Sequence, residues 1–237
     1  MLARCANLSS LFLAVAVGLP VGPAGGGGFD RVGPAGGAPG AFVRQDPDAI
    51  VRRADQALAA LRTLRAEFVQ EVVNPLLERT TTGRGRLLYQ APDRFRIAYA
   101  DPAGDLVVHD GTHVWIYLPS TQPGQVIRQA ADASGVRNPL TYLRDLRGRF
   151  TARDAGAEAV QGRTADKLVL SPRTPEAGFD EIVVWVDRAT GLLRRVRTTT
   201  EDGVTTTYTF TTLERNVALD DGPFRFTKPH GIEIFDQ

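Results

Sequence analysis

The chain has 237 residues, 43% of them apolar, which is enough to bury the core of one sizeable domain. Its formal net charge is only +1, so the sequence favours neither nucleic acid nor anionic lipid headgroups as partners, since both select a basic excess. A single cysteine, Cys5, leaves no pair from which an intramolecular disulfide could form.

The N-terminal residues have the pattern of a secretory signal peptide, which we expect to span residues 1–24. Arg4 gives a positive start, an apolar run from Leu8 to Leu19 follows, and the small residues near Ala24 suit cleavage. The run is shorter than the about 20 apolar residues that a membrane-spanning helix needs. A buried N-terminal helix is the alternative interpretation.

Residues 25–45 are rich in Gly and Pro, a composition that predicts a disordered tether. The folded domain is therefore expected to span residues 46–237. Asp46-Pro47-Asp48 predicts the start of a helix, because Asp is a preferred N-cap and Pro is tolerated in the first turn. The apolar residues that follow at helical spacing are Ile50, Ala54, Leu58 and Leu61. We expect this face to pack on its own domain rather than on a membrane surface.

A strand over residues 65–73 is predicted next, with Phe68 inward and Glu67 and Glu71 outward. Residues 83–119 then predict a meander of four antiparallel strands, because turn residues interrupt their alternating apolar runs. These turns lie at 91–93, 101–104 and 110–111.

Within this meander, Phe95, Ile97 and Tyr99 alternate with Arg94, Arg96 and Ala98, which predicts one apolar and one charged face. Residues 114–118 are apolar on both faces, so they must be covered on both sides. The cover is either other parts of the protein or something that the protein carries.

The second half of the chain predicts a helix over 138–146 and a further set of strands. These strands are expected at 125–129, 149–153, 164–170, 179–187, 192–200, 204–212, 224–226 and 232–235. The fold class is thus α+β and mainly β, with about ten or eleven strands in one long antiparallel sheet that must curl.

No catalytic or metal-binding motif stands out. His109 and His113 flank a carboxylate, but Asp110-Gly111 between them is a hairpin turn and not a helical ligand pair. No Gly-x-Ser-x-Gly nucleophile motif occurs. We therefore expect no enzyme activity, no metal and no cofactor. A cluster of Arg194, Arg195 and Arg197 is interpreted as solvated surface, with docking of an acidic partner as the alternative.

Several short segments resemble the LolA family, the periplasmic carriers of outer-membrane lipoproteins. They keep the family's order from about residue 46 to the end of the chain. They are Phe68-Val-Gln70, Gly85-Arg-Leu-Leu88, Pro92-Asp-Arg-Phe95, Pro102, Val108-His-Asp-Gly111, Trp115-Ile-Tyr117, Asp132-Ala-Ser-Gly135, Asn138-Pro-Leu140 and Phe224-Arg-Phe-Thr-Lys-Pro229 with Gly231-Ile232.

The resemblance implies an unclosed antiparallel β-barrel with helices covering its concave face and an apolar cavity for acyl chains. The residues expected to line this cavity are Phe68, Leu88, Phe95, Ile97, Tyr99, Leu106, Val108, Trp115, Tyr117, Leu140 and Leu143. The family usually has an Arg just before the proline of the Pro92 turn, linked to closing the lid, whereas this chain has Ala91. Either Arg94 or Arg86 takes that role, or apolar packing alone holds the lid.

The resemblance also implies partners and a location. The cargo would be outer-membrane lipoproteins, received from an inner-membrane ABC exporter and passed to an outer-membrane acceptor. The protein would act in the periplasm as a monomer, without binding nucleic acid. The alternatives are a carrier of a glycolipid or another amphiphile, and a non-enzymatic half-barrel that acts as a sensor or protein-interaction module.

Overall fold

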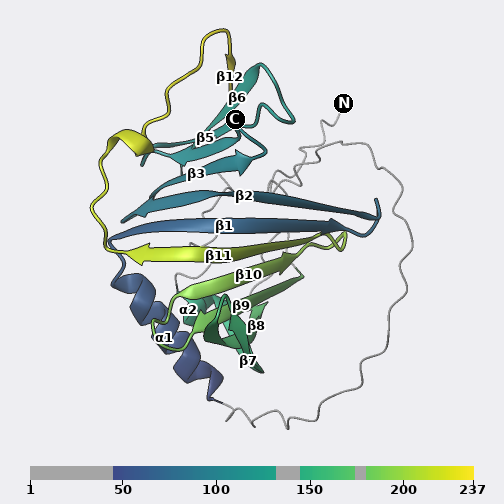
Figure 1. Cartoon of the computed structure of the whole chain (residues 1–237), viewed down its shortest axis with the longest axis vertical. Helices are drawn as coiled ribbons and strands as arrows, with labels where there is room; N and C mark the ends of the chain where they lie inside the picture. The colour runs from purple at the N-terminus through teal and green to yellow at the C-terminus, as the bar shows by residue number, and fades with distance from the viewer. Residues whose placement is uncertain (1–44, 132–144, 174–179) are drawn as a thin grey trace.

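The computed structural model describes residues 45–131, 145–173 and 180–237. The predicted signal peptide, nearly all of the tether and most of the predicted helix at 138–146 lie outside these ranges. Within them, twelve strands form one sheet (Figure 1). The strands are β1 (Thr63–Asn74), β2 (Arg79–Gln90), β3 (Arg94–Asp101), β4 (Leu106–His109), β5 (His113–Tyr117), β6 (Gln125–Ala130), β7 (Phe150–Val160), β8 (Arg163–Pro172), β9 (Glu181–Asp187), β10 (Leu193–Thr199), β11 (Thr205–Arg215) and β12 (Glu233–Asp236).

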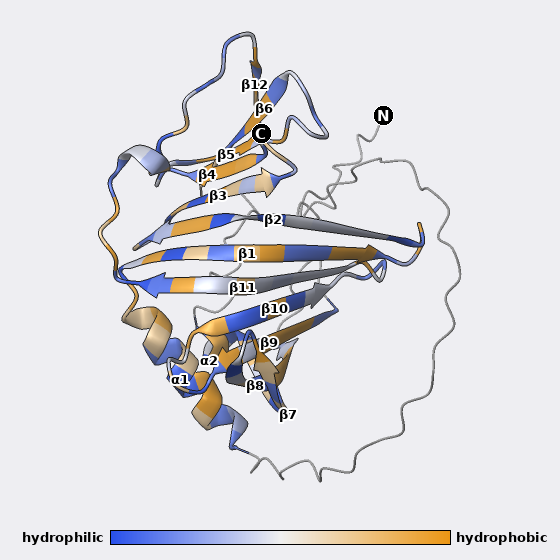
Figure 2. Ribbon diagram, viewed as in Figure 1, coloured by the Kyte–Doolittle hydropathy of each residue, from blue (hydrophilic) through white to orange (hydrophobic). Residues whose placement is uncertain are grey.

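The strand order is β12-β6-β5-β4-β3-β2-β1-β11-β10-β9-β8-β7, so the sheet is unclosed and ends in β12 and β7. Two antiparallel runs, β1 to β6 and β7 to β11, meet where β1 pairs with β11. The fold class predicted from the sequence is confirmed as mainly β with few helices, and the strand number is twelve rather than ten or eleven. Hydrophobic (orange) and hydrophilic (blue) residues are interspersed along β1 (Figure 2), and its side chains are alternately buried and exposed.

The C-terminal tail departs from the prediction of an entirely antiparallel sheet. Residues 224–226 were expected to form a strand, but Gly222–Phe224 is a turn of 3₁₀ helix, where Pro223 has no N–H to give to a ladder. The tail then returns along the sheet, and β12 pairs with β6 in parallel, with Glu233 beside Gln125. A bidentate ion pair supports this edge, with the Arg128 Nε 2.6 Å from the Asp236 Oδ1.

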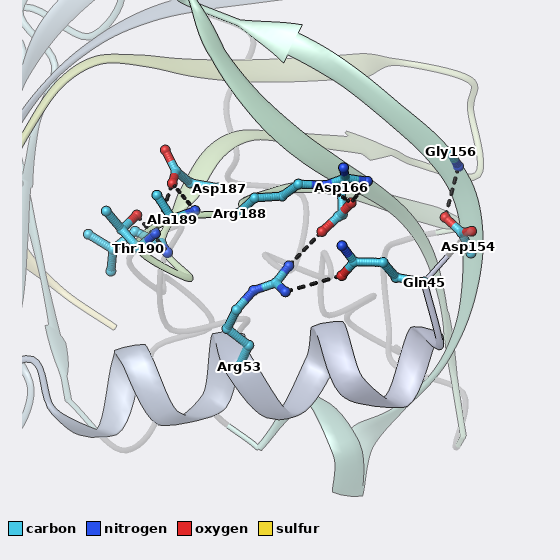
Figure 3. Close-up of polar contacts among 10 residues, drawn as sticks. Gln45, Arg53, Asp154, Gly156, Asp166, Asp187, Arg188, Ala189 and Thr190 are labelled. Atoms are coloured by element: carbon cyan, nitrogen blue, oxygen red, sulfur yellow. Dashed lines mark hydrogen bonds and ion pairs between the residues drawn. The ribbon is translucent and has the colours of Figure 1, made fainter. Parts of the chain in front are cut away.

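The opposite edge, β7, contains an irregularity. Its register with β8 shifts between Asp154 and Ala157, and Gly156 adopts a φ of +95°, a conformation that glycine reaches without steric cost. The Asp154 carboxylate accepts a hydrogen bond from the Gly156 N–H at 2.9 Å (Figure 3). This edge is therefore kinked.

Helix α1 (Pro47–Ala59) begins as predicted. The Asp46 carboxylate accepts a hydrogen bond from the Asp48 N–H at 3.1 Å, so it caps the helix. Ile50, Val51 and Ala54 of this helix are buried in the main core together with side chains of β1–β3 and β7–β11. The amphipathic face therefore packs on its own domain, as expected. The short helix α2 (Leu146–Arg149) lies beside α1 (Figure 1).

An ion-pair cluster joins α1 to the sheet. Asp166 of β8 is 1% exposed, and its carboxylate lies 2.5 Å from the Arg53 Nη2 and 2.6 Å from the Arg188 Nη2. The second guanidinium nitrogen of Arg53, Nη1, donates to the Gln45 Oε1 at 3.2 Å (Figure 3). One buried carboxylate thus holds a helical arginine and a turn arginine together.

Asp166→Asn is expected to lower the free energy of unfolding by about 2 kcal/mol, because a neutral amide no longer compensates the charges of Arg53 and Arg188. Urea denaturation measures this change. The matched control is Glu214→Gln, which removes an exposed carboxylate 3.1 Å from Arg65 and should cost less than about 0.5 kcal/mol. Equal losses in the two variants would contradict the role assigned to Asp166.

A second buried carboxylate, Asp187, organises the turn between β9 and β10. Burial alone would raise its pKa, but hydrogen bonds from Arg194, Arg163 and the backbone N–H groups of Thr190 and Ala189 outweigh burial and lower the pKa to about 2. Figure 3 shows Asp187 beside the turn residues Ala189 and Thr190. The turn predicted after residue 187 is therefore held by a charged aspartate.

Candidate functional site

Strand register decides which predicted cavity residues share a face. Phe68 lies opposite Gly85, and Gly85 lies opposite Tyr99. Along β3, Ile97 and Phe95 lie two and four residues before Tyr99, so their side chains are on the same face as Tyr99. Phe68, Phe95, Ile97 and Tyr99 therefore lie on one side of the sheet, the side whose buried residues form the main core with α1. We call this side the inner face.

Five other predicted cavity residues lie on the opposite side, which we call the outer face. They are Leu88, Leu106, Val108, Trp115 and Tyr117, as the pairings of β2 through β5 show. Leu140 and Leu143 fall outside the described residues. Because a cavity on the concave side draws on one face of the sheet, only the first four residues stay together in the site considered below.

The C-terminal tail covers part of the outer face. The Phe226 ring stacks on Trp115 with a centroid distance of 5.0 Å and meets the edge of Tyr117 at 6.3 Å. Residues 114–118 were expected to need cover on both sides, and on this side the cover is the chain itself. Sequence alternation could not have shown this, since Phe226 is more than 100 residues away from Trp115 along the chain.

An aromatic group forms the centre of the inner face near β1, β3 and β11. The Phe68 ring meets Tyr99 at 5.4 Å and Tyr208 at 5.5 Å, both edge-on. The two tyrosine hydroxyls lie 3.3 Å apart, and the Gln70 Nε2 donates to the Tyr208 hydroxyl at 3.0 Å. Polar atoms on this apolar surface are thus paired with one another.

Tyr99 of this aromatic group carries no charge near neutral pH. Burial raises the pKa of Tyr99 to about 12, although the hydrogen bond with Tyr208 opposes that shift. Gln70 and Tyr208 were not among the predicted cavity residues. The alternation of Tyr208 and Phe210 on the predicted strand at 204–212 is the signal that could have included Tyr208.

Gly85 makes room for the Phe68 ring. A Cβ at this position would lie 2.8 Å from the Phe68 Cζ and 2.5 Å from the carbonyl oxygen of Ala98. The ring therefore lies across the backbone of β2, where no side chain could be accommodated without movement. The prediction that Phe68 points inward is confirmed. The position of its ring depends on the absence of a side chain at Gly85.

The two histidines of the predicted turn lie on opposite faces. His109 pairs with Phe95 across the ladder and has its ring 5.4 Å from the Phe95 ring, whereas His113 precedes the inward residue Val114. Burial lowers the pKa of His109. Among the described residues, no group of three or more His, Cys, Asp or Glu is arranged to hold a metal ion.

The arginines considered for lid closure point away from the inner face. Arg94 lies 2.8 Å from Asp221 and over the ring of Phe224, and Arg86 lies 3.5 Å from Glu67. Both alternate with inward residues of their strands. Both arginines are thus paired on the outer face. The expectation that one of them, or apolar packing alone, closes a lid stays a prediction.

The basic cluster of β10 is neutralised by its neighbours. Arg194 pairs with Asp187 at 2.9 Å, Arg195 with Glu158 at 2.8 Å and Arg197 with Glu181 at 3.3 Å. Every guanidinium in the cluster faces a carboxylate, and Arg194 is bonded to the buried Asp187, so this structure favours a locally paired cluster over a free basic surface.

The arrangement defines a class of protein: a half-barrel in which a long, unclosed β-sheet presents one apolar face. No helix within the described ranges has the length and hydropathy needed to span a membrane.

Residues 59–227 match the sequence profile of the family described as "Outer membrane lipoprotein carrier protein LolA", and the chain therefore belongs to the LolA family. The outer-membrane lipoprotein carrier protein of Dechloromonas aromatica is 32% identical over 177 residues, which are 73% of this chain and 81% of that protein. The carrier protein of Haemophilus influenzae strain KW20 is 30% identical over 182 residues, covering 76% of this chain and 83% of its own length.

A solved structure supports the fold. An uncharacterised conserved protein from Thermus thermophilus aligns with a TM-score of 0.53 at 16% identity, covering 81% of this chain and 100% of its own. This likeness concerns the fold alone. The family and its named relatives are described as carriers, and the absence of enzyme activity in this chain stays a prediction.

Proposed function

We propose that this protein binds the acyl chains of lipoproteins against its inner face and carries them through the periplasm from the inner to the outer membrane. The observation that supports this proposal is the shared inward position of Phe68, Phe95, Ile97 and Tyr99 in a chain of the carrier family. An acyl chain held there would contact rings and aliphatic groups, and the nearby polar atoms are already paired.

Retention of cargo needs no covalent chemistry. Burying one CH₂ group is worth about 0.8 kcal/mol, so several buried groups offset the cost of ordering the chain. Release then requires a partner that offers a more favourable apolar site or changes the population of open carrier. The partners in this proposal are an inner-membrane ABC exporter that loads the carrier and an outer-membrane acceptor that unloads it, with the carrier itself acting as a monomer without catalysis.

Ile97→Glu is expected to reduce the lipid retained by the full chain at least about tenfold, because a carboxylate on the inner face would lose hydration beside an acyl chain. Periplasmic protein from a Gram-negative host is purified, and bound lipid is measured by native mass spectrometry. The matched control is Ala98→Glu, which adds the same charge to the adjacent residue on the outer face and should retain lipid within about twofold of the original chain.

Ile97 is only 6% exposed, so folding of this variant is checked by circular dichroism. If Ile97→Glu does not fold, Tyr99→Ser removes a ring from the same face without adding charge and is expected to lower lipid retention in the same direction. A folded inner-face variant that keeps its full lipid complement would contradict the proposal, as would a chain purified without lipid.

A further inference from the structure

Two adjacent hollows are lined mainly by outer-face residues, and the first of them also reaches Phe68, Gly85 and Tyr99 between the outward side chains. One, of about 500 Å³, lies over β1, β2 and β3; the other, of about 490 Å³, lies between β2–β4 and the C-terminal tail. Arg86 and Ala98 line both hollows, so the two are neighbours that share a wall. We call the combined feature the arginine groove, after the four arginines that line it: Arg84, Arg86, Arg96 and Arg225.

The charge of this groove is strongly one-sided. Glu67 is the one carboxylate among the residues lining the two hollows, and its ion pair with Arg86 is long, at 3.5 Å, and exposed. Within the described ranges, no ion pair joins Arg84 or Arg225 to a carboxylate. The groove thus differs from the basic cluster of β10, where each arginine is paired.

One arginine is already fixed in position. The Arg96 Nη1 donates to the carbonyl oxygen of Pro223 at 3.2 Å, and burial lowers the pKa of Arg96. This contact connects β3 to the tail that forms one wall of the groove. A guanidinium has five N–H donors, so Arg96 keeps donors for a ligand while it holds the wall.

The arginines are spread along the groove. Arg84 and Arg86 are two residues apart on β2, which separates them by about 7 Å on the same face of the strand. Arg96 extends the row on β3 and Arg225 on the tail. A single phosphate would require donors that converge on one point. A row of guanidinium groups instead fits a ligand whose negative charges recur at strand spacing.

The floor between the arginines is apolar. Leu88, Ala98 and Leu106 line the second hollow, and the surface is open to solvent on one side. An extended peptide sends alternate side chains to opposite directions, so one row of Glu side chains can present its carboxylates to the arginines and its CH₂ groups to this floor, while the backbone stays hydrated on the open side.

We propose that the arginine groove binds an extended acidic segment of a partner protein. The site lies on the opposite face from the inner-face residues, so a partner can dock while cargo is held. The inference therefore goes beyond carriage itself and adds a second, charge-based docking surface. Binding through exposed guanidinium groups should weaken as salt rises, since counter-ions screen such contacts.

The test measures fluorescence anisotropy of a fluorescein-labelled peptide of alternating Glu and Thr, titrated with the full chain. We expect saturable binding that weakens with sodium chloride and is absent for the matching Gln and Thr peptide. The double variant R84E/R86E is expected to weaken binding at least about tenfold, because two attractive contacts become repulsive. The control is Arg79→Glu, the same charge change on β2 outside the groove, with an expected effect within about twofold.

Three results would overturn the inference: no binding of the acidic peptide, equal loss in Arg79→Glu and the double variant, or groove-dependent binding of phosphatidylglycerol vesicles in place of the peptide. The double variant should retain lipid like the original chain. If the original chain binds the peptide but carries no lipid, the proposed function is wrong and the docking inference stands. If it carries lipid but does not bind the peptide, only the docking inference is wrong.

Discussion

Replacing Gly85 with alanine is expected to lower the free energy of unfolding by about 3 kcal/mol, because overpacking forces neighbours to move. The new Cβ would lie 2.5 Å from the carbonyl oxygen of Ala98, a backbone atom that cannot rotate away. It would also press on the Phe68 ring, which is packed between Tyr99 and Tyr208. Urea denaturation followed by tryptophan fluorescence measures the change.

Gly222→Ala is the matched control for this experiment. A Cβ at Gly222 would meet no atom within 4 Å, so the same added methyl group should change the stability by less than about 0.5 kcal/mol. The interpretation of Gly85 as a site of close packing would be wrong if the two variants unfolded at the same urea concentration.

Phe224→Ala is expected to cost about 4 kcal/mol, since a phenyl ring that is 1% exposed would leave a cavity. Phe224 lies in the tail, under the guanidinium of Arg94 at 5.4 Å, and fixes the segment that carries Phe226 and Pro223. Its loss should therefore also release the tail from the outer face. Urea denaturation measures the stability, and limited proteolysis measures how fast the tail that follows Asn216 is cleaved.

The control for the tail is Phe235→Ala. Phe235 belongs to β12 and is 44% exposed, so its truncation should cost less than about 1 kcal/mol. Faster cleavage is expected for Phe224→Ala alone. If both variants unfold and are cleaved alike, Phe224 does not anchor the tail.

Local signals in the sequence were sufficient for much of the sheet. The turn at Asp110-Gly111 separates β4 from β5, and the Asp110 carboxylate accepts hydrogen bonds from the Thr112 and His113 N–H groups at 2.8 Å each. Alternation along β3 placed Phe95 and Ile97 on one buried face, where both are now found. These features depend on neighbours in sequence, which is why they could be predicted.

Features that depend on distant segments were not predicted. Nothing in the run at 114–118 shows that Phe226 covers Trp115 and Tyr117, so these two residues were assigned to the cavity together with inner-face ones. The parallel pairing of β12 likewise depends on the path of the whole tail across the sheet. In strands that are apolar on both faces, periodicity cannot tell which side is covered by the chain and which by a ligand.

The two edges of the unclosed sheet bear on the protein's behaviour at high concentration. An open strand edge offers free N–H and C=O groups on which another chain could polymerise. Here one edge is a four-residue strand whose Asp236 is charged and ion-paired, and the other is kinked at Gly156. Both devices disfavour addition of a foreign strand, so a half-barrel that never closes can remain free of fibrillar self-association.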